Sequence, residues 1–182
     1  MIDFITNIDK EILYFIQEFL RYNFLNGIFS FITKGNGGFI WILITIILLI
    51  PKKTRKVGIL SLCSLLLCHV VNNLMIKNLV MRERPFNQFS ELIPLVKKPT
   101  DFSFPSGHTA ISFAVSGILV RYLDKKYGMT AIVFAVLIAF SRLYVGVHFL
   151  SDVIVGMIIG LLSSFIVSKV DKHLCSKNKK EI

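Results

Sequence analysis

The sequence predicts an all-α integral membrane protein, built as a bundle of about six transmembrane helices. Hydrophobic residues make up 54% of the 182 positions and charged residues only 18%, a composition that is not typical of soluble proteins. Backbone groups in lipid must hydrogen-bond within their own segment, so long apolar runs are expected to be helical. Five such runs, several of them near the roughly 20 residues that cross a bilayer, lie at residues 39–50, 57–79, 109–123, 129–140 and 151–170.

The region before these runs is less regular. Residues 1–36 are expected to form an N-terminal helical region, and residues 37–182 the motif-bearing bundle of a single domain that includes the whole chain. Polar side chains such as Glu18 and Arg21 interrupt the apolar stretch 12–32. We favour a tilted or broken spanning helix here, because a sixth span leaves both termini on one side. The alternative is an interfacial amphipathic helix followed by a short insertion.

The net charge of +10 is concentrated at the ends of the predicted helices. Short, positively charged loops stay on the cytoplasmic side of a membrane. We therefore expect a cytoplasmic C-terminus and polar motifs on the extracytoplasmic side, and we attribute the charge to topology rather than to nucleic-acid binding. The three clusters are Lys52, Lys53, Arg55 and Lys56; Arg121, Lys125 and Lys126; and Lys169, Lys172, Lys177, Lys179 and Lys180.

The first polar motif is Lys77 followed, after six residues, by Arg84-Pro85. Seven residues are nearly two helical turns, so both cations share a face if the helix continues that far. Pro85 then stops or turns the chain. An ammonium beside a forked guanidinium suits a phosphate group. The alternative is that both side chains simply extend to the membrane interface.

The second motif, Pro105-Ser106-Gly107-His108, directly precedes an apolar run. A helix that starts here presents free backbone amides, a hydroxyl and an imidazole, which together suit an anion. Gly107 allows close approach of the backbone, and Ser106 can donate to a phosphate oxygen or cap the helix. An ordinary serine cap is the structural alternative, but it assigns no role to His108.

The third motif joins Ser141-Arg142 to His148 and Asp152. If helix has begun by His148, the carboxylate four residues later lies on the same face as the imidazole. Asp152 could then hold Nδ1–H and leave Nε2 free to act as a nucleophile. A purely structural His-Asp pair between two helices is the alternative.

Together the three motifs resemble the signature of the type 2 phosphatidic acid phosphatase (PAP2) superfamily, K-x6-RP, PSGH and SR-x5-H-x3-D. The match is complete in residues, order and spacing over about the last two-thirds of the chain. The N-terminal third is similar only in hydropathy and in the turn Gly35-Asn36-Gly37-Gly38, which resembles the small bacterial undecaprenyl-diphosphatase-type members.

The resemblance implies a six-helix membrane bundle that acts as a lipid phosphatase through a phosphohistidine. His148 would be the nucleophile, Asp152 would orient it, and His108 would protonate the leaving oxygen and later activate water. The residues expected to hold the phosphoryl oxygens are Lys77, Arg84, Ser106, Gly107 and Arg142. Phosphoryl transfer depends mostly on positioning and charge stabilisation, which these residues could supply.

No Cys or His spacing suggests a metal site, so we expect metal-independent chemistry without a cofactor. The expected partner is an anionic lipid in a bacterial plasma membrane, and undecaprenyl diphosphate is the favoured substrate. Extra cations at Arg82, Lys97 and Lys98 could favour a diphosphate. Phosphatidylglycerol phosphate or phosphatidic acid is the main alternative. A lipid phosphotransferase and a non-catalytic lipid-binding or transport protein also remain open, as does the oligomeric state.

Overall fold

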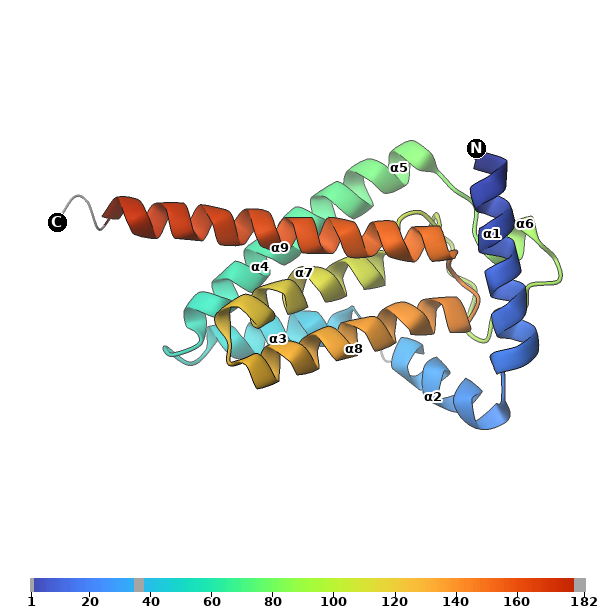
Figure 1. Ribbon diagram of the computed structural model, residues 1–182, viewed down its shortest axis with the longest axis horizontal. Helices are drawn as coiled ribbons and strands as arrows, with labels where there is room; N and C mark the ends of the chain where they lie inside the picture. The colour runs from blue at the N-terminus through green and yellow to red at the C-terminus, as the bar shows by residue number, and fades with distance from the viewer. Residues whose placement is uncertain (1, 35–37, 179–182) are drawn as a thin grey trace.

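The computed structural model describes residues 2–34 and 38–178, and these residues form helices and loops with no strand among them (Figure 1). This confirms the predicted all-α fold class. The elements in chain order are α1 (Ile2–Phe15), η1 (Ile16–Leu20), α2 (Asn23–Lys34), α3 (Phe39–Leu49), α4 (Arg55–His69), η2 (Val70–Ile76), α5 (Lys77–Val80), α6 (Pro85–Gln88), α7 (Gly107–Tyr122), α8 (Lys125–Tyr144) and α9 (Leu150–Asn178).

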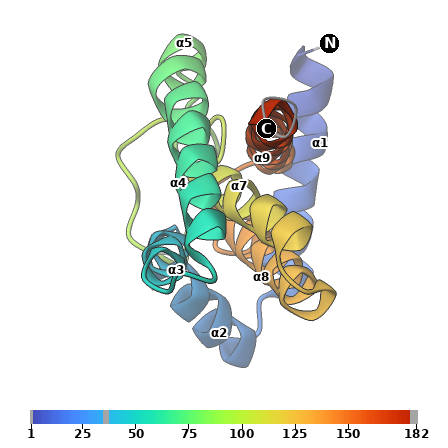
Figure 2. The ribbon, with the colours of Figure 1, turned by 90° about the vertical axis from the view of Figure 1, so that its left-hand side faces the viewer.

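Helix α7 is the centre of the bundle and packs against α9, α8 and α4 (Figure 2). Most of its side chains are buried, and many of them are small. Helix α9 approaches it closely at Gly156, where a Cβ atom would lie 2.7 Å from the carbonyl oxygen of Ser106. Small residues at such a contact let two helix backbones come together. The start of α7, which carries the second motif, is therefore held firmly against the start of α9.

Three stretches of the described residues are long and apolar enough to cross a bilayer, Arg55–Gln88, Lys125–Tyr144 and Leu150–Lys177. Helix α3 is apolar but has only 11 residues, and α7 has 16. The protein is thus an integral membrane protein by its helices, whereas the number of six spans stays a prediction.

The N-terminal region departs from the interpretation we favoured. The helix ends at Arg21, whose backbone is extended. The Arg21 guanidinium donates to the carbonyl oxygens of Ile93 at 2.6 Å and Tyr144 at 3.2 Å. Helix α1 lies across one end of the bundle, and only α2 runs back along α8 (Figure 1). At 12 residues, α2 is about 18 Å long and too short to span roughly 30 Å of hydrocarbon. The alternative of an end-lying helix followed by a short insertion describes these residues better.

The described residues of the three basic clusters lie around the connection between α3 and α4, around the turn between α7 and α8, and in the C-terminal part of α9. These segments lie toward the end of the bundle away from α1 (Figure 1). There the Asp171 carboxylate of α9 pairs with Lys56 of α4 at 2.9 Å and accepts a hydrogen bond from the Tyr122 hydroxyl of α7 at 2.9 Å. Lys179 and Lys180, the Gly35-Asn36-Gly37 part of the turn, and the boundary expected between residues 36 and 37 lie outside the described residues.

Candidate active site

A cavity of about 190 Å³ lies at the other end of the bundle, where helices α5, α7 and α8 begin or end. Six of the eight predicted site residues line it, and the remaining two, Ser106 and Asp152, lie behind its wall, each with none of its surface exposed. The structure therefore brings all three motifs together. The lining residues are Gly38, Asn73, Lys77, Arg84, Pro99, Asp101, Gly107, His108, Ile111, Arg142 and His148.

Lys77 and Arg84 meet at this cavity, but not on one helix face as the spacing suggested. Helix α5 ends at Val80, Met81 adopts a left-handed conformation with φ of 49°, and Arg84 is extended. The loop before α7 joins the two cations instead. The Asp101 carboxylate lies 2.6 Å from Lys77 Nζ and 2.7 Å from Arg84 Nη2. A carboxylate of the protein thus contacts the two cations expected to bind phosphate.

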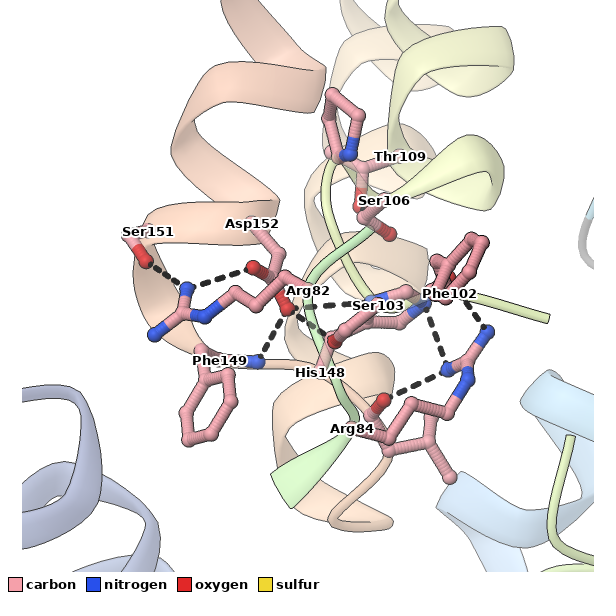
Figure 3. Close-up of polar contacts among 12 residues, drawn as sticks. Arg82, Arg84, Phe102, Ser103, Ser106, Thr109, His148, Phe149, Ser151 and Asp152 are labelled. Atoms are coloured by element: carbon pink, nitrogen blue, oxygen red, sulfur yellow. Dashed lines mark hydrogen bonds and ion pairs between the residues drawn. The ribbon is translucent and has the colours of Figure 1, made fainter. Parts of the chain in front are cut away.

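The Arg84 guanidinium is held in place from several sides (Figure 3). Its Nε donates to the Asp101 carbonyl oxygen at 2.8 Å, and its Nη1 donates to the Val147 carbonyl oxygen at 2.7 Å. The residue is only 3% exposed. A guanidinium fixed in this way needs little reorganisation to bind an anion, which is the condition for strong electrostatic stabilisation.

Arg142 supplies a third buried cation at the cavity. Its Nη1 donates to the Thr33 hydroxyl of α2 at 3.3 Å, and Thr33 shares a further hydrogen bond of 2.8 Å with the Ser141 hydroxyl. The Arg142 Nε is buried and has no hydrogen-bond partner among the described residues. Arg142 lines the cavity together with Lys77 and Arg84, so three positive charges make this space suited to an anion.

The start of α7 forms another wall of the cavity. Gly107 is its first residue, and a Cβ atom at this position would lie 3.4 Å from the Asn73 side-chain amide. The Ser106 hydroxyl accepts a hydrogen bond from Thr109 Oγ1 at 3.0 Å and does not cap the helix with its side chain. Ser106 therefore occupies the N-cap position, as the serine-cap interpretation expected, but without a side-chain capping bond. Donation from Ser106 to a phosphate oxygen stays a prediction. His108 lines the cavity half-buried, and no described residue hydrogen-bonds its ring.

His148 lies in the turn between α8 and α9, which Gly146 makes possible with φ of 76°. Helix α9 begins only at Leu150, so His148 is not yet helical, yet its Nδ1 lies 3.5 Å from Asp152 Oδ2. Its Nε2 lies 3.4 Å from Arg84 Nη1. A guanidinium can only donate, so this contact suits a neutral imidazole with its proton on Nδ1, facing Asp152, and its lone pair on Nε2, at the cavity.

Asp152 has partners that the motifs did not reveal (Figure 3). It accepts hydrogen bonds from the Ser103 hydroxyl at 2.5 Å and the Phe149 amide at 2.9 Å, and it pairs with Arg82 Nη1 at 2.8 Å. Arg82 therefore points away from the cavity, contrary to its suggested role in diphosphate binding. Residues 97 and 98 do not line the cavity either, and Lys98 lies over the Phe86 ring. No sequence spacing identified Ser103 or this use of Arg82.

Within residues 2–34 and 38–178, no group of three or more His, Cys, Asp or Glu side chains is placed where it could hold a metal ion. The charged groups that face the cavity are instead three cations and one carboxylate.

Replacing Asp101 is expected to strengthen inhibition by inorganic phosphate. Burial alone would raise the pKa of Asp101, but the hydrogen bond from Lys77 and the charges of Arg84 and Lys77 lower it to about 2. The carboxylate is therefore ionised at neutral pH and must move before another anion can use both cations. In Asp101→Asn we expect the inhibition constant of phosphate to fall about threefold to tenfold. Unchanged or weaker inhibition, compared with Asp124→Asn at the far end of the bundle, would contradict this competition.

The His148 imidazole is expected to stay neutral down to about pH 4. Burial lowers the pKa of His148 to about 4, with the charges of Arg84 and Arg142 adding to the effect and Asp152 opposing it. A lowered pKa means that the proton binds only in more acidic solution, so the nucleophilic form predominates throughout pH 5–8. NMR titration of histidine-labelled protein in lipid nanodiscs, assigned with His148→Ala, measures this directly. A midpoint near the ordinary value of 6.5 would contradict it.

Comparison with known proteins gives a consistent result. Residues 57–174 match the model of the PAP2 superfamily. An undecaprenyl-diphosphatase of Sulfolobus acidocaldarius is 37% identical over 147 residues, which cover 81% of this chain and 71% of that protein. The structure of LpxE from Aquifex aeolicus superposes with a TM-score of 0.77 and 26% identity, covering 87% of this chain and 93% of the other. A PAP2-type phosphatidylglycerolphosphate phosphatase from Bacillus subtilis superposes with a TM-score of 0.75 and 30% identity, covering 92% and 86%.

Proposed function

We propose, since this chain belongs to the PAP2 superfamily of membrane lipid phosphatases, that it releases phosphate from an isoprenoid diphosphate, converting undecaprenyl diphosphate to undecaprenyl phosphate. The observation that carries the reaction class is the cavity itself, where His148 Nε2 faces a space lined by Lys77, Arg84 and Arg142. The choice of lipid is supported by the 37% identity to a protein named undecaprenyl-diphosphatase.

In the proposed reaction, His148 Nε2 attacks the terminal phosphorus and forms a P–N bond as the bond to the leaving oxygen breaks. His108, which takes up a proton when the anionic substrate binds beside it, gives that proton to the leaving oxygen. The His108 imidazole then takes a proton from water, and the water oxygen attacks phosphorus. The P–N bond to His148 breaks and phosphate is released. Asp152 holds the Nδ1 side of His148 throughout.

The three cations, the Gly107 amide and the Ser106 hydroxyl are proposed to hold the phosphoryl oxygens. Charge spreads over these oxygens in the transition state, and preorganised donors stabilise it without the cost of reorganising water. Two features support this assignment. Arg84 is held by backbone carbonyls, and Arg142 is a buried cation that lines the cavity. The Ser106 hydroxyl would have to turn from Thr109 to take part.

The same proposal places the protein in a bacterial plasma membrane with the cavity facing the extracytoplasmic side. It is supported by the connections α3–α4 and α7–α8 and the C-terminal part of α9, which carry the described basic residues and lie toward the opposite end of the bundle, because basic loops remain in the cytoplasm. The C-terminus would then be cytoplasmic, and the lipid tail of the substrate would stay in the bilayer beside the cavity.

A second candidate substrate is phosphatidylglycerol phosphate. It is favoured by the 30% identity and close superposition of a Bacillus subtilis phosphatase named for that lipid. Both substrates present a terminal phosphate on a membrane lipid, so the same residues could act on either one.

Phosphate release by detergent-purified protein in EDTA tests the proposal. Undecaprenyl diphosphate, phosphatidylglycerol phosphate and phosphatidic acid are compared side by side, with His148→Ala as the control. We expect release that survives EDTA, is fastest on the diphosphate and vanishes in the variant. Faster phosphate release from a glycerolipid would mean that this glycerolipid, and not undecaprenyl diphosphate, is the substrate. Absence of release from all three would favour a phosphotransferase, which product analysis in ¹⁸O-labelled water identifies, or a binding protein.

A further inference from the structure

Behind the cavity, Arg82 lies between two buried carboxylates. Its Nη1 is 2.8 Å from Asp152 Oδ1, and its Nη2 is 2.8 Å from Asp9 Oδ2. Asp152 has no exposed surface and Asp9 is 2% exposed. The Arg82 guanidinium also lies 3.9 Å from the centre of the Phe149 ring. This arrangement connects a residue of the third motif to the N-terminal helix α1, which no motif includes.

Asp9 is attached to the catalytic turn by a second route. Its Oδ1 accepts a hydrogen bond from the Ser151 amide at 2.9 Å, and its Oδ2 accepts one from the Ser151 hydroxyl at 2.5 Å. Ser151 is the second residue of α9, so a carboxylate of α1 lies at the N-terminus of α9, where negative charge is stabilised. Arg82 Nη1 donates to the same hydroxyl at 2.6 Å (Figure 3).

We propose that Asp9 and Arg82 are positioning residues for the His148–Asp152 pair, so that helix α1 forms part of the support of the active site. The inference rests on the proposed function, in which His148 forms a P–N bond. The two oxygens of Asp152 have separate partners, since Oδ1 pairs with Arg82 and Oδ2 contacts Ser103, the Phe149 amide and His148. Arg82 thus sets the rotation of the carboxylate that His148 needs.

Charge balance gives Asp9 a specific task. When Nε2 of His148 bonds to phosphorus while Nδ1 keeps its proton, the ring becomes positively charged. Asp152 and Arg82 alone form a neutral pair, which offers this charge little stabilisation. With Asp9 included, the three groups carry a net charge of −1, and the attraction acts in a buried region of low dielectric. Asp9 should therefore favour the step that charges His148, without affecting the cations that bind phosphate.

Four variants of the full-length protein in nanodiscs test this inference. They are Asp9→Asn, Arg82→Gln, the double variant, and Glu11→Gln as a matched control on the exposed face of α1. We expect Asp9→Asn to lower kcat about tenfold or more, while KM and the inhibition constant of inorganic phosphate stay within about twofold. Arg82→Gln should lower kcat further, because Asp152 loses the partner that sets its rotation and both carboxylates lose their cation. Without Arg82 nothing joins the Asp9 carboxylate to Asp152, so the double variant, which also removes the unpaired charge of Asp9, should be no slower than Arg82→Gln.

Three results would overturn the inference. One is a kcat of Asp9→Asn equal to that of Glu11→Gln. Another is independent, multiplicative losses from the two substitutions. The third is a loss of kcat matched by an equal loss of inorganic phosphate binding, which indicates a merely structural role. Turnover by His148→Ala would instead reject the proposed function. An inactive His148→Ala together with a fully active Asp9→Asn rejects this inference alone.

Discussion

Replacing His148 by alanine is expected to abolish turnover, by about 10³-fold or more, and to leave phosphate binding nearly intact. The imidazole lines the cavity, and an alanine at this position has no atom that can attack phosphorus. The three cations do not depend on it for position. Arg84 is held by the Asp101 and Val147 carbonyl oxygens, and Lys77 by the Asp101 carboxylate. Chemistry and binding should therefore separate.

Two measurements establish this separation. Steady-state phosphate release gives the loss of kcat, and displacement of a bound lipid substrate by inorganic phosphate gives the affinity of the cavity. His69→Ala is a matched control, because His69 is exposed on α4 and does not line the cavity. Turnover of His148→Ala within tenfold of the control would rule out His148 as nucleophile. A large loss of phosphate binding would show that the ring supports the cation cluster instead.

Much of this site could be predicted from the sequence because its residues lie at helix ends. Apolar runs show where helices cross the membrane, and short polar motifs between them must gather at the surface. Gly107 begins α7 and Asp152 lies in the first turn of α9, as expected from PSGH and from the His148–Asp152 spacing. The helix ends then converge because α7 packs against both α8 and α9.

Other features could not be predicted because they depend on contacts between distant segments. Lys77 and Arg84 are joined by Asp101, from a loop of irregular structure, and the left-handed Met81 ends the helix between them. The pairing of Asp9 with Arg82 crosses 73 residues of sequence. Hydropathy also could not tell a spanning helix from two short ones in the N-terminal region, since it does not record the change of direction at Arg21.

The loss of activity in His108→Ala is expected to depend on the leaving group of the substrate. In the proposed reaction His108 protonates the leaving oxygen, and a positioned acid of this kind contributes about 10²- to 10⁴-fold. The leaving group of phosphatidic acid is a glycerol oxygen, which leaves poorly without a proton. The leaving group of undecaprenyl diphosphate is undecaprenyl phosphate, which leaves well. We therefore expect His108→Ala to slow formation of the P–N bond far more with phosphatidic acid than with the diphosphate.

Hydrolysis of the P–N bond needs His108 again, now to take a proton from water, whatever the first substrate was. With terminally ³²P-labelled undecaprenyl diphosphate, His108→Ala should therefore accumulate label on the protein, up to about one phosphoryl group per chain. The label should survive alkali and be lost in acid, as expected of a P–N bond, and it should be absent from the His108→Ala/His148→Ala double variant. Equal losses of rate on both substrates, with no label on the protein, would show that His108 supports binding instead. A residue that only helps to bind the phosphate group should affect every substrate equally.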